Sequence, residues 1–159
     1  GTVTKGRPNV DYAQTDADFN GYEFEVGRSF STNNGELQIS YGREEVVGTF
    51  ASGGNVPRIT PIKNVYRFAL EQRDVTYDIK IMDVQKEDDI GFGESVTDGY
   101  TMVDFDIRRS IAIGSDEELV LSVFGRNLMD EKARNHTSYV KNEVPLAGRN
   151  FGIKLNFNF

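Results

Sequence analysis

The sequence contains no cysteine, a single histidine and no long apolar run. Without cysteine the chain has no disulfides, no thiolate metal sites and no cysteine nucleophile. No apolar stretch approaches the roughly 18 residues that a membrane-spanning helix requires, and 27% of the residues are charged. The formal net charge of -7 leaves no basic face for nucleic acid. We therefore expect neither a helical membrane protein nor a nucleic-acid-binding protein.

What the chain does have is strict alternation, most clearly in its last eleven residues. One set of side chains there is apolar and the other polar: Phe151, Ile153, Leu155, Phe157 and Phe159 alternate with Asn150, Lys154, Asn156 and Asn158. Successive side chains of a strand point to opposite faces of its sheet. Residues 150–159 therefore predict a strand with one apolar and one polar face that ends on an aromatic residue.

The same alternation recurs about seven times along the chain, without heptads or a convincing helical period. The expected strands cover residues 21–27, 36–41, 66–71, 75–81, 103–108, 119–124 and 150–159. The fold class is therefore all-β, an antiparallel up-and-down sheet. One face is predicted to carry Tyr22, Phe24, Tyr66, Phe68, Ile79, Val103, Phe105, Leu121, Ile153, Leu155 and Phe157. A slip of one residue would place Asp104 or Lys154 among them.

The expected connections alternate between short and long. Residues 31–35, 73–74 and 114–117 have turn composition, whereas residues 43–61, 84–98 and 129–146 form long segments. Short turns on one rim and long loops on the other are typical of outer-membrane barrels, whose short side is periplasmic. By this count residues 1–13 belong to a long-side loop that follows a strand outside the chain. Charges on the second face, such as Asp104 and Asp106, require water because a dry core would penalise them.

Residues 125–159 resemble the end of a TonB-dependent outer-membrane receptor. The matching pieces are Asn127-Leu128-Met129-Asp130, Pro145-Leu146-Ala147-Gly148-Arg149 and the terminal Phe159, and residues 14–23, 56–61 and 97–104 look like earlier parts of such a barrel. The resemblance implies that residues 1–159 are the C-terminal part of a transmembrane barrel of about 22 strands. It also implies that the plug domain is absent.

The resemblance further implies a function, a location and partners. The intact receptor would sit in the lipid of the bacterial outer membrane and import a scarce nutrient with energy relayed by TonB, which contacts the missing N-terminal part. Leu155, Phe157 and Phe159 would form the signal that the barrel-assembly machinery reads. Residues 133–138, Lys141 and Pro145 look most like the zinc-uptake branch, so zinc or a metal chelate would be the cargo. No cofactor would be required.

Two loop clusters are candidates for metal chemistry. His136 lies near Asp130, Glu131 and Glu143 in the last long segment, and imidazole with carboxylates suits zinc. The alternative is a loop histidine that hydrogen-bonds the rim. The acidic stretch with Glu87, Asp88, Asp89, Glu94 and Asp98 could attract cations, or it could be a solvated surface, and its spacing does not match an EF-hand. Arg126 and Arg149 are expected near strand ends. Arginines of the polar face could pair with residues such as Asp106 and help to hold a plug, or they could form an ordinary charge ladder between neighbouring strands.

Other functions remain open at this point. A self-contained small barrel, acting as a structural protein or adhesin, would need an even strand number. A soluble β-sandwich binding module would need its apolar faces to pack on each other. We expect no enzyme, because the sequence has no Gly-x-Ser-x-Gly, phosphate-loop or zinc-protease motif.

Overall fold

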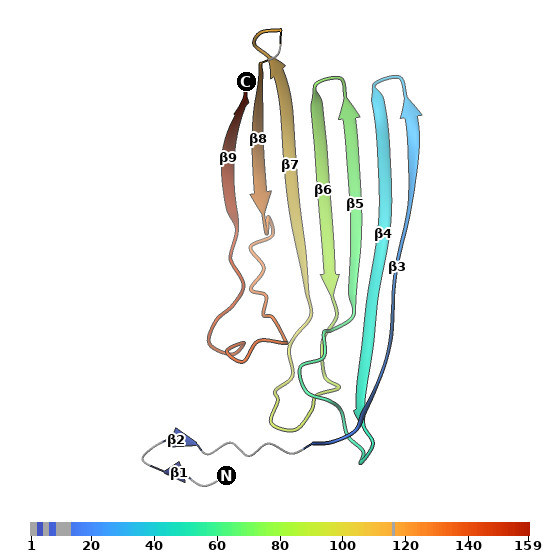
Figure 1. The fold of residues 1–159 in the computed structure, drawn as a ribbon, viewed down its shortest axis with the longest axis vertical. Helices are drawn as coiled ribbons and strands as arrows, with labels where there is room; N and C mark the ends of the chain where they lie inside the picture. Colours follow the sequence, from blue (N-terminus) through green and yellow to red (C-terminus); the bar gives the residue numbers. More distant parts are fainter. Residues whose placement is uncertain (1–2, 5–6, 9–13, 116) are drawn as a thin grey trace.

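A computed structural model describes residues 3–4, 7–8, 14–115 and 117–159. All regular structure in these residues is β: a small pair, β1 (Val3–Thr4) and β2 (Arg7–Pro8), and one seven-stranded sheet (Figure 1). The strands of the sheet are β3 (Ala17–Thr32), β4 (Gly35–Phe50), β5 (Lys63–Gln72), β6 (Val75–Val84), β7 (Tyr100–Ala112), β8 (Glu118–Arg126) and β9 (Asn150–Asn158). No helix that could cross a membrane occurs in the described ranges.

The sheet follows the chain order from β3 to β9, and every neighbouring pair is antiparallel. This is the predicted up-and-down arrangement. β3 and β9 form the two outer edges, so the sheet is open, and closure into a barrel is not seen in this chain. The expected all-β class and the seven strands are thus confirmed, whereas the barrel stays a prediction.

The observed strands include the first six predicted ones and extend further, and β9 covers the predicted last strand up to Asn158 but not Phe159. The largest difference lies in β4, which continues to Phe50 although residues 43–61 were predicted to be a loop. Arg43 and Glu45 stand where the alternation requires apolar residues, and this hid the strand. The ladder with β3 nevertheless continues through Tyr22 opposite Glu45 and Asn20 opposite Val47, because backbone pairing does not depend on side-chain polarity.

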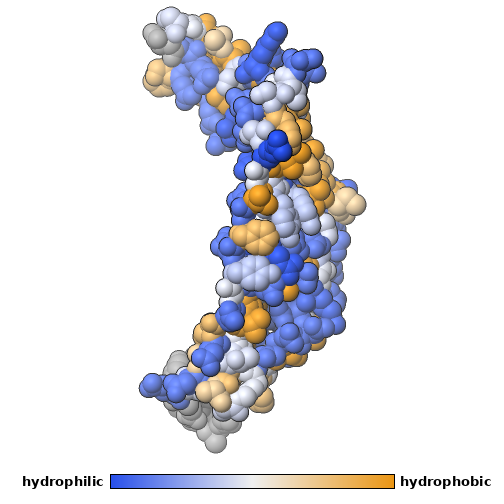
Figure 2. Space-filling view, turned by 90° about the vertical axis from the view of Figure 1, so that its right-hand side faces the viewer, coloured by the Kyte–Doolittle hydropathy of each residue, from blue (hydrophilic) through white to orange (hydrophobic). Residues whose placement is uncertain are grey.

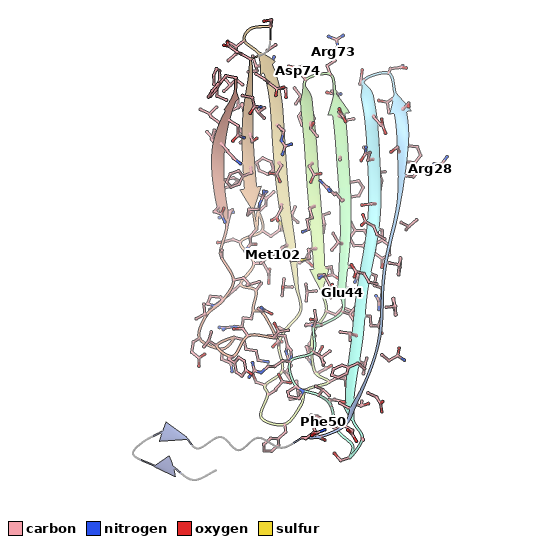
Figure 3. The ribbon with its side chains drawn as sticks, in the orientation of Figure 1. Arg28, Glu44, Phe50, Arg73, Asp74 and Met102 are labelled. Atoms are coloured by element: carbon pink, nitrogen blue, oxygen red, sulfur yellow. The ribbon has the colours of Figure 1, made fainter. Side chains whose placement is uncertain are left out.

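Short and long connections lie at opposite ends of the sheet, as predicted. Residues 33–34, 73–74 and 113–117 connect strands at the end where the chain terminates, and residues 51–62, 85–99 and 127–149 form the long loops at the other end (Figure 1). Arg73 and Asp74 mark the short-turn end in Figure 3, and Phe50 lies near the long-loop end. The prediction of a loop over residues 1–13 falls mostly outside the described residues.

The two faces of the sheet have different compositions. The registers pair Ile39 with Phe68, Phe68 with Ile79 and Ile79 with Phe105, so these side chains share one face. The same registers place all the predicted apolar residues, from Tyr22 to Phe157, on that face, which confirms the assignment. We call it the apolar face. Asp104 and Asp106 lie on the opposite one, the polar face.

The sheet is a single layer with almost no interior. Seen from the β3 edge, it is a thin, bowed slab (Figure 2). Among the described hydrophobic residues, only Val84 and Ala133 are buried, and Ile153 and Leu155 expose 71% and 65% of their surface. A large exposed apolar patch marks a surface that needs a protein or membrane partner. The apolar face therefore has no cover within the described chain.

Candidate functional site

The three long loops meet at one end of the sheet and contact each other through buried polar side chains. Arg58 comes from the loop 51–62, Glu94 and Thr97 come from the loop 85–99, and His136 and Lys141 come from the loop 127–149. Thr97, His136 and Lys141 are each at most 6% exposed. We call these five residues the loop junction.

His136 is at the centre of the loop junction. Its Nδ1 atom lies 2.9 Å from the Thr97 hydroxyl oxygen and 3.1 Å from Lys141 Nζ. Because an ammonium group only donates hydrogen bonds, Nδ1 must accept, and the proton of the neutral ring is on Nε2. Nε2 faces Glu94 Oε1 at 3.6 Å. Burial, and then the positive charge of Lys141, lower the pKa of His136. Both effects favour the neutral ring.

The neighbours of His136 tie the three loops together. Glu94 accepts the backbone N–H of Arg58 at 2.9 Å and that of Gly91 at 3.0 Å. Lys141 Nζ donates to the Ser95 carbonyl at 2.6 Å. The Arg58 guanidinium donates to the Thr137 carbonyl at 3.3 Å, and its central carbon lies 3.2 Å from the centre of the Tyr139 ring. The loop junction is therefore a continuous network with interactions to charged groups, which are stronger than neutral hydrogen bonds.

The structure does not bring the three predicted metal ligands together. The lone pair of His136 Nδ1 is occupied by Thr97 and Lys141, as described above. Asp130 is exposed and accepts the backbone N–H of Arg149 at 2.9 Å, and Glu131 is also exposed. Across residues 14–115 and 117–159, no group of three or more histidines and carboxylates has metal-binding geometry. A ligand role for His136, Asp130 or Glu131 stays a prediction.

The acidic stretch divides between two environments. Glu87, Asp88 and Asp89 line a cavity of about 230 Å³ next to the end of β4. Lys86 pairs with Asp88 at 2.8 Å. Burial raises the pKa of Glu87, and a hydrogen bond from the backbone of Asp89 offsets only part of this rise. Glu94 instead points into the loop junction. Capture of a cation by this stretch stays a prediction as well.

The polar face carries a charged groove of about 520 Å³, and the sequence predicted its charge ladder but not the groove. Charged residues that line it include Glu23, Glu25, Glu44, Lys63, Arg67, Asp78, Lys80, Asp104, Asp106 and Arg126. Arg67 pairs with Asp78 at 2.6 Å and Arg126 with Asp106 at 2.8 Å, while Lys63 also pairs with Glu44. The predicted charge ladder is present, and it leaves this face suited to water.

The residues of the expected assembly signal lie on the last strand and just beyond it. Leu155 and Phe157 are on the apolar face, and Phe159 is 94% exposed. The rings of Phe157 and Phe159 are 5.7 Å apart. Their exposure leaves them accessible to a partner, and recognition by the assembly machinery stays a prediction.

Comparison with known proteins identifies a similar fold. No family model and no curated protein matches the chain. Among solved structures, the copper transporter OprC matches with a TM-score of 0.80 and 18% sequence identity. The match covers 91% of this chain but 24% of OprC, so the chain spans about a quarter of that protein's length. At this level of identity the likeness concerns the fold.

These findings correct the family prediction. The prediction of a TonB-dependent receptor is wrong, because the matching structure reported above is a copper transporter and no family model matches. The predictions of TonB-driven import and of the zinc-uptake branch rested on that resemblance alone, so they are not supported either. The pieces that carried the resemblance have local structural roles. Asn127, for example, has a φ of 49° and binds the backbone of Glu131. Asn tolerates such a positive φ better than most residues, so the turn geometry gives Asn127 a local structural role.

Proposed function

We propose that this sheet is part of the wall of a larger β-barrel in the bacterial outer membrane, and that the barrel takes part in metal uptake. The observation that carries the proposal is the division of one seven-stranded layer into an exposed apolar face and a charged face. In a barrel the apolar face meets lipid and the polar face meets a water-filled lumen. Both faces then have the surroundings that their side chains require.

The open edges support the same proposal. β3 and β9 present unpaired backbone groups, which are unfavourable in lipid and are removed when further strands close a barrel. The likeness to about a quarter of a copper transporter agrees with such a larger barrel. Because the matched protein is a copper transporter, copper is the first candidate for the metal cargo. Outer-membrane lipid and the barrel-assembly machinery are the proposed partners.

Single cysteines test the membrane assignment cleanly, because the chain has none of its own. Phe68→Cys on the apolar face and its neighbour Ala69→Cys on the polar face form a matched pair, examined in protein isolated from the outer-membrane fraction. We expect an environment-sensitive label to report lipid at position 68 and water at position 69. Equal exposure to water at both positions, in protein that stays soluble without detergent, would favour a soluble binding module.

Metal uptake and assembly need separate measurements. Cells that lack the protein should accumulate less copper under copper starvation, and equal accumulation would contradict the metal role. Deletion of Phe159 should reduce the amount of protein assembled in the outer membrane much more than it reduces the stability of assembled protein. Equal yields with and without Phe159 would contradict the proposal that the barrel-assembly machinery recognises this residue.

A further inference from the structure

A row of hydrogen-bonded polar side chains crosses the apolar face near its long-loop end. Arg43, Asn64, Asp83 and Thr101 are successive register partners on β4, β5, β6 and β7, so they are on the same face and next to each other. Tyr22 and Glu45, paired across β3 and β4, extend the row to the sheet edge. We call these six residues the polar row.

The side chains of the polar row satisfy one another. Arg43 donates to Glu45 at 2.7 Å, to the Tyr22 hydroxyl at 2.8 Å and to Asn64 at 3.2 Å. Asn64 and Thr101 both donate to Asp83, at 3.5 and 3.0 Å. A charge on the lipid-facing side of a barrel is strongly destabilising at the middle of the bilayer and much less so at the interface. The polar row therefore has to lie outside the hydrocarbon.

A second polar boundary lies at the short-turn end. Asp74 lies in the turn before β6 and forms an ion pair at 2.9 Å with Arg109, which is the register partner of Val75 on β7. The pair marks the end of the apolar side chains on β6, whereas Ile111 and its partner Leu119 continue the apolar face beyond Arg109 on β7 and β8. Asp83, on β6, and Asp74, in the turn just before β6, are nine positions apart, which corresponds to roughly 30 Å at the rise of a strand. A tilt of about 40° reduces this to roughly 23 Å of height, close to the typical apolar band of about 25 Å.

The side chains between the two boundaries agree with this reading. On β6 they are Val75, Tyr77, Ile79 and Ile81, all apolar or aromatic. Tyr41 and Tyr66, whose rings are 5.0 Å apart, border the polar row on its apolar side, and the Tyr41 hydroxyl donates to Asn64 at 2.9 Å. Tyrosines of this kind concentrate at membrane interfaces. Arg28, on edge strand β3, is the exception, and its guanidinium lies over Phe30, toward the short-turn end.

We propose that the polar row sits in the lipid headgroup layer on the long-loop side and fixes the depth of the sheet in the membrane. The depth proposal rests on the proposed barrel function and specifies the position of the lipid boundary on the sheet. The partner is the lipid headgroup layer of the membrane leaflet on the long-loop side. The loop junction is then wholly outside the hydrocarbon on that side, because its three loops connect strand ends that extend past the polar row.

Quenching by lipids brominated at different depths tests the proposal. Ile79→Cys, Thr101→Cys and Ala69→Cys, each with a fluorescent label, are compared in protein reconstituted into phosphatidylcholine vesicles. Bromines near the chain ends should quench the label at 79 at least threefold more than the label at 101, which aqueous iodide should reach. The label at 69, on the polar face, should respond to iodide alone.

The outcomes separate the two proposals. Equal deep-bromine quenching at positions 79 and 101 would overturn the polar row as a boundary and leave the membrane assignment intact. No bromine quenching at position 79 would overturn the membrane assignment itself, and the depth proposal with it. Thr101→Cys removes only the hydrogen bond to Asp83. The bond between Arg43 and Asn64 remains, so the rest of the polar row is preserved in this variant.

Discussion

The sheet and the loop junction differ in where they bury their side chains. On the sheet, large apolar residues such as Phe151 and Ile153 are more than half exposed, and backbone ladders hold the strands together. In the loop junction, Thr97, His136 and Lys141 are at most 6% exposed and are hydrogen-bonded. The sheet therefore depends on what surrounds it, whereas the loops carry their own polar interior. The two regions should therefore respond differently to substitution and to pH.

The largest effect is expected on the apolar face. Ile79→Arg should lower the free energy of unfolding of the membrane-inserted protein by about 2–4 kcal/mol, because it places a charge in the middle of the lipid band. Ala69→Arg on the polar face is the control and should cost much less. Unfolding by urea in lipid vesicles measures both. Equal costs for the two substitutions would mean that the faces do not differ in their surroundings.

A smaller and more local effect is expected from Glu94. Glu94→Ala removes the acceptor of two backbone N–H groups, those of Arg58 and Gly91, and should destabilise the loops by about 1–3 kcal/mol. Asp88→Ala, at an exposed ion pair with Lys86, should have a much smaller effect, because solvent screens the pair. Hydrogen exchange of residues 85–99 measures the local opening. Faster exchange throughout the sheet with Glu94→Ala would contradict the independence of the two regions.

Acid should loosen the loop junction but not the sheet. The folded-state pKa of His136 is lowered, so the unfolded loop binds a proton at a higher pH than the folded one. The stability from neutral His136 is therefore present above the unfolded pKa of about 6.5 and is lost as the pH falls toward the folded value. The charged groups that face it are Glu94, Lys141 and Arg58.

His136→Gln isolates this effect, because glutamine does not titrate. Exchange in the loops of the wild-type protein should speed up between pH 6.5 and 5 relative to the variant. The raised pKa of Glu87 acts in the opposite direction, and it is present in both proteins and cancels in the comparison. Identical pH profiles for the two proteins would show that His136 does not govern the junction.

The sequence predicted the sheet well because the signal for a strand is local. Val103, Asp104, Phe105 and Asp106 alternate within four residues, and this pattern alone assigns each side chain to a face. The end of β4 was missed because Arg43 and Glu45 interrupt the alternation, and both belong to the polar row. The two polar residues that break the alternation of β4 are thus also the residues that mark the proposed membrane boundary.

The loop junction was not predictable in the same way. His136 and Thr97 are 39 positions apart, and Arg58 and Thr137 are 79 apart. Nothing in the spacing of these residues indicates that they meet, since the contacts depend on the strand order that brings three loops to one end. The sequence therefore offered Asp130 and Glu131 as neighbours of His136, whereas the structure supplies Lys141, Thr97 and Glu94.

The smallest effect is expected for metal binding by His136. His136→Ala should change the affinity of the intact protein for copper or zinc less than tenfold, because the Nδ1 lone pair is already engaged by Thr97 and Lys141. A ligand role would require both contacts to break and would place a cation next to the Lys141 ammonium. Metal titration of the wild type and the variant near neutral pH measures the difference, with Asp130→Ala as a control outside the junction. A loss of tenfold or more with His136→Ala alone would restore His136 as a ligand and make the loop junction a metal site.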